Sequence, residues 1–179
     1  GTQAAKMAAG LGAQVTIMDT NLARLRYLSD VMPANVVTQY STLLAIKEKL
    51  PTVDLLVGAV LLHGAKAPHL VKQADLKLME AGSVIVDVAV DQGGCIETTE
   101  VTSHSKPTVI KHDVVHYGVP NIASKVPRTA SVAVSNIITP LLIKAGNQGS
   151  VEALLYDGTG VRNGVYTYKG ALTNEYLSK

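Results

Sequence analysis

The sequence contains no tryptophan and no phenylalanine, and aromatic residues make up only 4% of its 179 residues. Any buried core must therefore be built from valine, isoleucine, leucine, alanine and methionine, which is typical of helices packed on a parallel sheet. The hydrophobic content of 47% excludes an intrinsically disordered chain. The length suits one domain with a small extension.

An excess of charge of one sign is also lacking. The 16 basic and 14 acidic residues are interspersed and leave a net charge of +2. We find no basic stripe and no aromatic platform of the kind that binds nucleic acid. No uninterrupted apolar run reaches the roughly 20 residues of a membrane span, and no signal peptide is recognisable. The sequence therefore predicts neither a nucleic-acid partner nor a membrane partner.

Cys95 is the single cysteine, so an internal disulfide is excluded and a reducing compartment such as the cytoplasm is favoured. Its place after two glycines would suit either a nucleophile or a small loop residue, and the second is favoured because no histidine lies nearby in the local pattern. The five histidines are scattered, and the one pair four residues apart, His112 and His116, flanks a predicted strand rather than lying on a helix. No metal is expected.

Short apolar segments alternate with helical ones along most of the chain. Strands are predicted at 15–18, 36–38, 53–60, 83–89, 108–111 and 114–117, and helices at 4–11, 22–32, 43–50, 70–79, 128–145 and 151–156. This alternation predicts an α/β fold with a doubly wound parallel sheet and a C-terminal helical extension. Ligands of such folds bind at the carboxyl ends of the strands.

The first 19 residues have the pattern of a nucleotide-binding βαβ unit that has lost its first strand. A small, alanine-rich helix follows Gly1, and a short strand then ends on Asp19. Dinucleotide folds place a glycine-rich turn before the first helix and an acid about 20 residues later. An acid there binds the ribose hydroxyls and repels a 2′-phosphate, which favours NAD over NADP. Spacing alone leaves a second reading equally open, in which Asp19 only caps the next helix.

Arg24 and the segment 58–62 are weaker candidates. Arg24 would contact the adenine or a phosphate, although a solvated surface arginine is the commoner case. The small residues of 58–62 end a buried strand and would let a flat ligand approach the backbone, although close packing explains them equally well.

Two acids, Asp87 and Asp91, lie around the end of the strand at 83–89, and a Gln-Gly-Gly run follows. Asp87 stands inside an apolar run and would be costly if buried without partners. Asp91 lies just beyond the strand, where α/β enzymes place catalytic groups, and could handle a proton or a water molecule. A turn-stabilising aspartate is the alternative; position and chemistry together favour function.

These segments, in this order, resemble alanine dehydrogenase over essentially the whole chain. The resemblance rests on residues 1–8, 15–21, 58–61, 64–68, 83–94, 116–122 and 126–129. It implies a Rossmann-type NAD-binding domain over 1–126, and a linking helix and tail over 127–179 that pack on a substrate domain. It also implies NAD-dependent oxidative deamination of L-alanine to pyruvate and ammonium, a homo-oligomer (hexamers are usual in the family) and a cytoplasmic enzyme.

The resemblance also implies roles for individual residues. Asp91 matches the family's catalytic acid, and it lies among the cofactor contacts as well. The residues that match cofactor contacts are Gly1, Asp19, Arg24, Ser41, Val60, Leu61, Val88, Ala89, Val90, Asp91, Val119, Pro120, Asn121 and Ile122. The family's usual Val-Ala-Asn-Met is Val-Pro-Asn-Ile here, which stiffens that loop.

The family's amino-terminal region supplies the substrate-binding arginine and lysine and a catalytic histidine, and nothing matching it precedes Gly1 in this sequence. We therefore expect these 179 residues to be inactive by themselves. The alternative function is that of the NAD-binding module of a proton-translocating transhydrogenase, which passes hydride to a partner protein. The run Asp91–Gly94 and the helix start at 129–131 favour the dehydrogenase.

Overall fold

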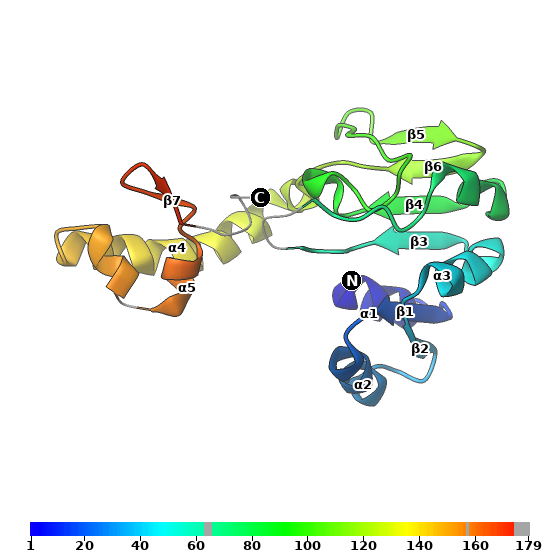
Figure 1. The fold of residues 1–179 in the computed structure, drawn as a ribbon, viewed down its shortest axis with the longest axis horizontal. Helices are drawn as coiled ribbons and strands as arrows, with labels where there is room; N and C mark the ends of the chain where they lie inside the picture. The colour runs from blue at the N-terminus through cyan, green and yellow to red at the C-terminus, as the bar shows by residue number, and fades with distance from the viewer. Residues whose placement is uncertain (63–65, 157, 174–179) are drawn as a thin grey trace. The chain divides into compact units, whose positions relative to one another are not determined.

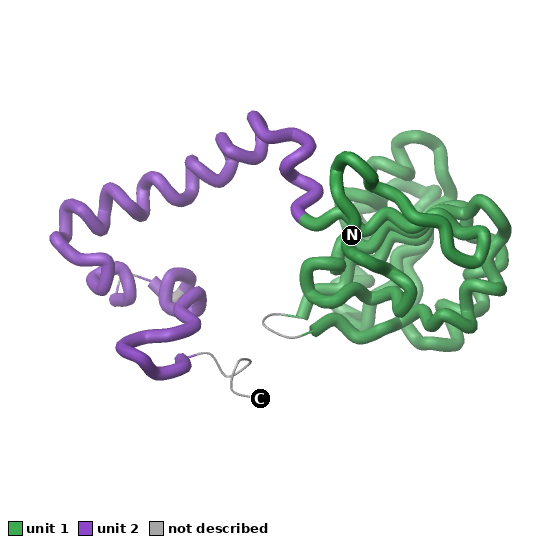
Figure 2. Tube along the Cα trace, turned by 90° about the horizontal axis from the view of Figure 1, so that it is seen from above, with its two compact units in different colours: residues 1–62, 66–120 green, residues 63–65, 121–179 purple. Residues whose placement is uncertain are grey.

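A computed structural model of the chain describes residues 1–62, 66–156 and 158–173. They form two compact units, shown in green and purple in Figure 2. The first unit contains residues 1–62 and 66–120, and the second contains the described residues from 121 onward. The units therefore divide at 120 and 121, whereas the sequence places the domain boundary at 126 and 127.

The first unit begins with two α-helices and two strands. They are α1 (Thr2–Gly10), β1 (Val15–Asp19), α2 (Leu22–Val31) and β2 (Val36–Tyr40). Strands β1 and β2 pair in parallel, with Val15 opposite Val36. Asn21 caps α2, as expected, because its side-chain oxygen accepts a hydrogen bond from the Arg24 backbone N–H at 2.9 Å.

The larger sheet of the first unit has four strands. The elements are α3 (Leu43–Lys49), η1 (Leu50–Thr52), β3 (Leu55–Gly58), β4 (Val84–Asp87), β5 (Thr108–Lys111) and β6 (Val114–Tyr117). The strand order is β3-β4-β6-β5 (Figure 1). β3, β4 and β6 are parallel, and β5 is an antiparallel edge strand joined to β6 by a tight turn. The predicted α/β fold with a parallel sheet is therefore confirmed.

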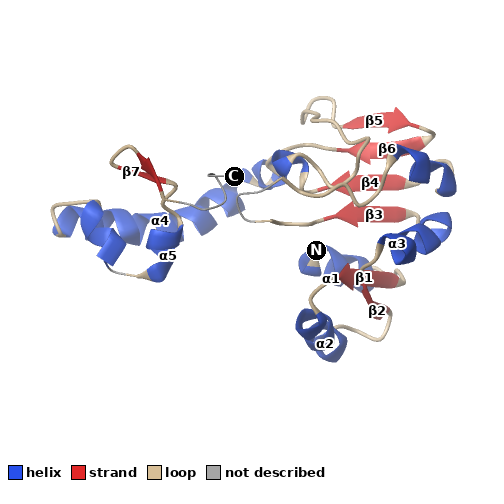
Figure 3. Cartoon of the chain, in the orientation of Figure 1, coloured by secondary structure: helices blue, strands red, loops and turns tan. Residues whose placement is uncertain are grey.

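The arrowheads of β1, β3, β4 and β6 point to the same side in Figure 3. The carboxyl ends of these strands therefore share one edge of the first unit. β1–β2 and β3–β4–β6–β5 are separate sheets, and β1 and β3 each have one edge without a strand partner among the described residues. A doubly wound sheet without its first strand is expected to show this arrangement, because that strand lies between the two halves.

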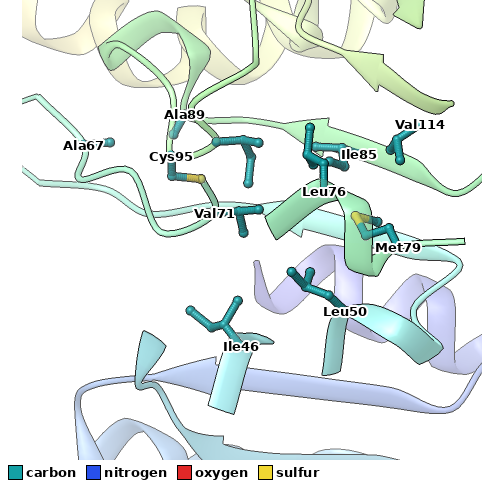
Figure 4. Packing of buried hydrophobic residues seen from close by; sticks show 11 residues of the cluster. Ile46, Leu50, Ala67, Val71, Leu76, Met79, Ile85, Ala89, Cys95 and Val114 are labelled. Carbon is teal, nitrogen blue, oxygen red and sulfur yellow. The ribbon is translucent and has the colours of Figure 1, made fainter. Parts of the chain in front are cut away.

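The hydrophobic core of the first unit packs against the four-stranded sheet (Figure 4). Leu76, Ile85 and Val114 are fully buried at its centre, and Ile46 and Leu50 reach it from α3 and η1. Aliphatic side chains thus fill the space that phenylalanine and tryptophan occupy in many other cores.

The α-helix predicted at 70–79 is wrong. Val71 forms a β-bridge with Ile96, and a 3₁₀ helix, η2 (Gln73–Leu78), follows it. The bridge takes up backbone groups at the start of the predicted helix, and Asp75 stabilises the turn that follows, because its carboxylate accepts a hydrogen bond from the Lys72 backbone N–H at 3.0 Å. The helix predicted at 151–156 is likewise a 3₁₀ helix, η5 (Glu152–Tyr156).

The second unit contains the long helix expected at 128–145, which is observed as α4 (Pro127–Asn147). It also contains η4 (Ile122–Lys125), α5 (Thr159–Asn163), and the short pair β7 (Thr167–Tyr168) and β8 (Ala171–Leu172). α4 has the length and mean hydropathy, 1.2, of a membrane span, and 6% of that stretch is buried. Polar residues such as Ser135, Asn136 and Thr139 interrupt the apolar run in this segment, so the sequence pattern did not predict this property. A single helix of this kind also occurs in soluble proteins, so it does not define a membrane protein.

Candidate functional site

Three of the predicted site residues lie together at the carboxyl edge of the small sheet. Gly1 precedes α1, Asp19 ends β1, and Ser41 directly follows β2. The Ser41 backbone N–H donates to the Asp19 carbonyl oxygen at 2.9 Å, which fixes these two residues side by side.

Asp19 makes the hydrogen bond that the capping interpretation of its sequence position predicts, and its second oxygen remains open. Oδ1 accepts a hydrogen bond from the Asn21 backbone N–H at 2.9 Å, so the side chain stabilises the turn into α2. The side chain is only half-buried, and Oδ2 has no partner among the residues that the structure describes. A carboxylate held by one oxygen and open at the other can still accept hydrogen bonds from ribose hydroxyls.

Arg24 is exposed, but two contacts hold its guanidinium in place. Its Nη2 donates to Thr2 Oγ1 at 3.0 Å, which connects α2 to the first residue of α1. Its guanidinium also lies over the Tyr27 ring, 5.1 Å from the centroid. These two contacts place a positive charge next to the amino end of α1, where free N–H groups favour an anion.

The segment after β3 lies close to the start of the chain. A Cβ built on Gly1 would lie 3.7 Å from the Cβ of Ala59, an ordinary van der Waals contact. Val60 is half-buried and Leu61 is exposed. The next residues, 63–65, lie outside the described residues.

The loop after β4 carries Asp91. Val88 is exposed, Ala89 and Val90 are buried, and Asp91 lies exposed in a short 3₁₀ turn, η3 (Val90–Gln92). The Gln92 and Gly94 backbone N–H groups both donate to the Ala89 carbonyl oxygen, at 2.8 and 3.0 Å.

Gly93 and Gly94 have positive φ angles of 88° and 73°, which glycine adopts without strain. The methylenes of Lys66 also occupy the space that a side chain at residue 93 would need. Lys66 is not among the predicted site residues, because only the folded loop brings it to Gly93.

Asp87 is fully buried, and its carboxylate has the hydrogen-bond partners that a buried charge requires. Its carboxylate accepts backbone hydrogen bonds from Ala89 at 3.0 Å, Cys95 at 2.9 Å and Ile96 at 3.2 Å. Burial and the neighbouring Asp87 carboxylate raise the pKa of the Cys95 thiol to about 12. Cys95 therefore lacks both the lowered pKa and the exposure of a reactive cysteine.

The remaining predicted residues follow β6. Val119 is buried and Pro120 half-buried in the first unit. Asn121 and Ile122 belong to the second unit, where Asn121 adopts a left-handed conformation with φ 51° and begins η4. The Asn121 carbonyl oxygen accepts hydrogen bonds from both the backbone N–H and the hydroxyl of Ser124.

His116 is a buried structural residue of β6. Its Nδ1 lies 3.0 Å from the Val114 carbonyl oxygen and its Nε2 lies 2.8 Å from Thr98 Oγ1, so both ring nitrogens have partners. Burial lowers its pKa below the ordinary value. Within residues 1–62, 66–156 and 158–173, no three acidic, histidine or cysteine side chains are grouped as metal ligands.

These observations fit a dinucleotide. A carboxylate with one oxygen open ends β1, an arginine lies at the amino end of α1, and the loops that follow β3 and β4 lie at the same edge. The polar groups at this edge suit ribose hydroxyls and phosphates, and the backbone of the two loops suits a flat ring. The fold and the site thus define a dinucleotide-binding domain of the Rossmann type.

The family model described as "Alanine dehydrogenase/PNT, C-terminal domain" matches residues 1–175. The chain belongs to this family, which confirms the resemblance found in the sequence. It is 47% identical over 180 residues to alanine dehydrogenase of Bacillus subtilis (strain 168), covering 100% of this chain and 47% of that protein. Alanine dehydrogenase 2 of Staphylococcus aureus (strain USA300) is also 47% identical over 180 residues, with 100% and 48% covered.

Solved structures agree with these relatives. An L-alanine dehydrogenase matches with a TM-score of 0.87 and 45% identity over 99% of this chain and 48% of that one. A transhydrogenase from Sinorhizobium meliloti matches with a TM-score of 0.73 and 26% identity over 98% of this chain and 46% of that one. The chain thus spans about half the length of the relatives that it matches.

Proposed function

We propose that this chain is the NAD-binding part of an alanine dehydrogenase. The complete enzyme, meaning this chain together with the part of the sequence that its relatives have and this chain does not span, converts L-alanine, NAD⁺ and water to pyruvate, ammonium, NADH and a proton. The observation that carries the proposal is the exposed Asp91 in the loop after β4, at the carboxyl edge where β1 ends on Asp19, in a chain that is 47% identical to named alanine dehydrogenases.

The residues at this edge have distinct roles in the proposal. Asp19 Oδ2 accepts hydrogen bonds from the adenosine ribose, and Ser41 adjoins the adenine side. Gly1 and Arg24 are the residues that face the phosphates. The cofactor, when bound, supplies the hydride acceptor.

The residues proposed to line the nicotinamide half come from the segments after β3, β4 and β6. They are Val60, Leu61, Val88, Ala89, Val90, Val119, Pro120, Asn121 and Ile122. Asp91 acts on the proton or water at the reacting carbon, because its carboxylate is exposed at the tip of the loop and the buried residues around it hold the backbone in place.

The second candidate is the NAD-binding module of a proton-translocating transhydrogenase. The structural match to the transhydrogenase favours it, but at 26% identity against 45% for the alanine dehydrogenase structure. A homo-oligomer and a cytoplasmic location complete the proposal, and both rest on the likeness to alanine dehydrogenases.

The test is the Asp91→Asn variant of the complete enzyme, assayed by NADH production from alanine and NAD without any partner protein. Loss of a positioned acid or base lowers kcat by about 10²- to 10⁴-fold, whereas the NAD dissociation constant stays close to that of the parent. Asp113→Asn is the matched control, because Asp113 is an exposed aspartate in a left-handed turn that asparagine tolerates.

Unchanged turnover in Asp91→Asn would exclude the catalytic assignment. Hydride exchange with an NADP-binding partner that needs no alanine, shown by the parent enzyme, would favour the transhydrogenase instead.

A further inference from the structure

The buried Asp87 performs a task that the proposed function leaves unassigned. Its two oxygens hold both ends of the loop that carries Asp91. Oδ1 accepts from the Ala89 backbone N–H at 3.0 Å, at the start of the loop, and Oδ2 accepts from Cys95 at 2.9 Å and Ile96 at 3.2 Å, at its end. One carboxylate therefore closes the loop, and no cation pairs with it among the described residues.

The Cys95 thiol is a fourth donor to the same group. Its sulfur lies 3.5 Å from Asp87 Oδ1, and the Val60 backbone N–H also contacts the thiol. A neutral thiol can donate to a carboxylate, whereas a thiolate in the same place would repel it. The thiol thus connects the Asp87 carboxylate to the segment after β3 that is proposed to line the cofactor.

The arrangement has almost no room to shift. A Cβ on Gly94 would lie 2.8 Å from Asp87 Oδ2, and a Cβ on Gly58 would collide with the Cys95 sulfur. The Val88 backbone N–H donates to the Gly58 carbonyl oxygen at 2.7 Å and fixes the first residue of the loop. The two glycines thus let the backbone approach the Asp87 carboxylate and the Cys95 sulfur closely.

The connection to Asp91 passes through Ala89. The Ala89 N–H is bound by Asp87, and its carbonyl oxygen accepts from Gln92 at 2.8 Å and Gly94 at 3.0 Å, which closes the turn containing Asp91. Asp91 itself is exposed and depends on this turn for its placement.

We infer that Asp87, together with the Cys95 thiol, is a positioning residue that sets the location of the Asp91 carboxylate; this inference rests on the proposed function. Asparagine at 87 keeps the size of the side chain but offers one acceptor oxygen and an NH₂ group, so at least one buried backbone N–H would face another donor. A displacement of a catalytic group by about 1 Å can cost roughly 10²-fold in rate.

The test compares Asp87→Asn, Asp91→Asn and the double variant in the complete enzyme, with Asp75→Asn as control. Asp75 is also a buried carboxylate bound by a backbone N–H, but its partners are Lys72 and Lys47 rather than the loop. Asp87→Asn is expected to lower kcat by roughly 10²-fold, and Asp75→Asn to leave kcat within about twofold of the parent.

The double variant separates positioning from general destabilisation. If Asp87 acts through Asp91, adding Asp87→Asn to Asp91→Asn lowers kcat by no more than about twofold further. The inference would be overturned if the fold-losses in kcat of the two single variants multiplied in the double variant. A folded Asp87→Asn enzyme with the kcat of the parent would overturn it as well. If Asp91→Asn alone retains parent turnover, it is the proposed catalytic role that fails.

A second readout does not depend on activity. Alkylation of Cys95 by iodoacetamide, followed by peptide mass spectrometry, reports opening of the loop, because the buried thiol reacts only when exposed. Asp87→Asn should accelerate labelling by about tenfold or more, and Asp75→Asn should not. Equal labelling rates in the parent and Asp87→Asn would overturn the inference whatever the outcome for Asp91.

If Asp87→Asn does not fold, the thiol supplies the milder test. Cys95→Ala removes one donor and should lower kcat several-fold, with Cys95→Ser restoring it because a hydroxyl can donate to the same carboxylate. Equal kcat values for the alanine and serine variants would count against the inference.

Discussion

Gly58, the last residue of β3, has no room for a side chain. A Cβ there would collide with the Cys95 sulfur and lie 3.4 Å from Asp87 Oδ1. The sulfur cannot retreat, because the Cys95 backbone N–H is bound to Asp87 and its carbonyl oxygen accepts from Leu70 at 2.8 Å. Gly58→Ala therefore forces either β3 or the loop around Cys95 to move.

Overpacking of this kind costs about 1–3 kcal/mol, and the rigid surroundings place Gly58→Ala toward the upper end of that range. Cys95→Ala alone removes a buried sulfur and costs on the order of 1 kcal/mol through the lost packing. In the double variant the new methyl group enters the space that the sulfur has left. The double variant should therefore lose at least about 1 kcal/mol less of the free energy of unfolding than the two single variants lose in sum.

The assay is unfolding of the complete enzyme in urea, with free energies of unfolding compared across the parent, the two single variants and the double variant. Gly10→Ala is the matched control, because Gly10 ends α1 and a Cβ there would meet no atom within 4 Å. This change should be neutral or should stabilise by up to about 1 kcal/mol. Additive losses at Gly58 and Cys95, or a Gly58→Ala variant as stable as the parent, would refute the proposed steric conflict.

Two further predictions concern Asp19 and His116. Asp19→Ala removes the oxygen proposed to bind the ribose and should raise the KM for NAD by about 10- to 100-fold, as expected for a charged hydrogen bond worth about 1.5–3 kcal/mol. The same change should reduce the ratio of kcat/KM for NAD to kcat/KM for NADP. An unchanged ratio, measured with both cofactors, would contradict the ribose role. Because the pKa of His116 is lowered in the folded protein, the unfolded chain takes up a proton first as the pH falls. The free energy of unfolding should therefore be at its full value above about pH 6.5 and should decrease below it by at most about 1.4 kcal/mol per pH unit. Urea unfolding at several pH values should show this slope in the parent and a smaller one in His116→Gln, and identical slopes would exclude His116 as its source.

The sequence by itself determined the order and type of most elements. Short buried strands such as those at 108–111 and 114–117 are observed with the predicted bounds, because a run of β-branched residues between turn signals is decisive locally. Asn21 was recognisable as a helix cap for the same reason, since its bond to the Arg24 N–H spans only three residues. The ordered motifs of the whole chain also carried the family, which the comparisons confirmed.

Only the tertiary structure decided what happens where distant segments meet. The predicted helix at 70–79 gives way to a β-bridge between Val71 and Ile96 and a 3₁₀ helix, because residues far along the chain compete for the same backbone groups. From the sequence alone, a buried Asp87 would be expected to destabilise the fold. Its four donors come from Ala89, Cys95 and Ile96, which no local pattern could place around one carboxylate. Local propensity fixes elements, but a buried charge is made stable only by the folded chain around it.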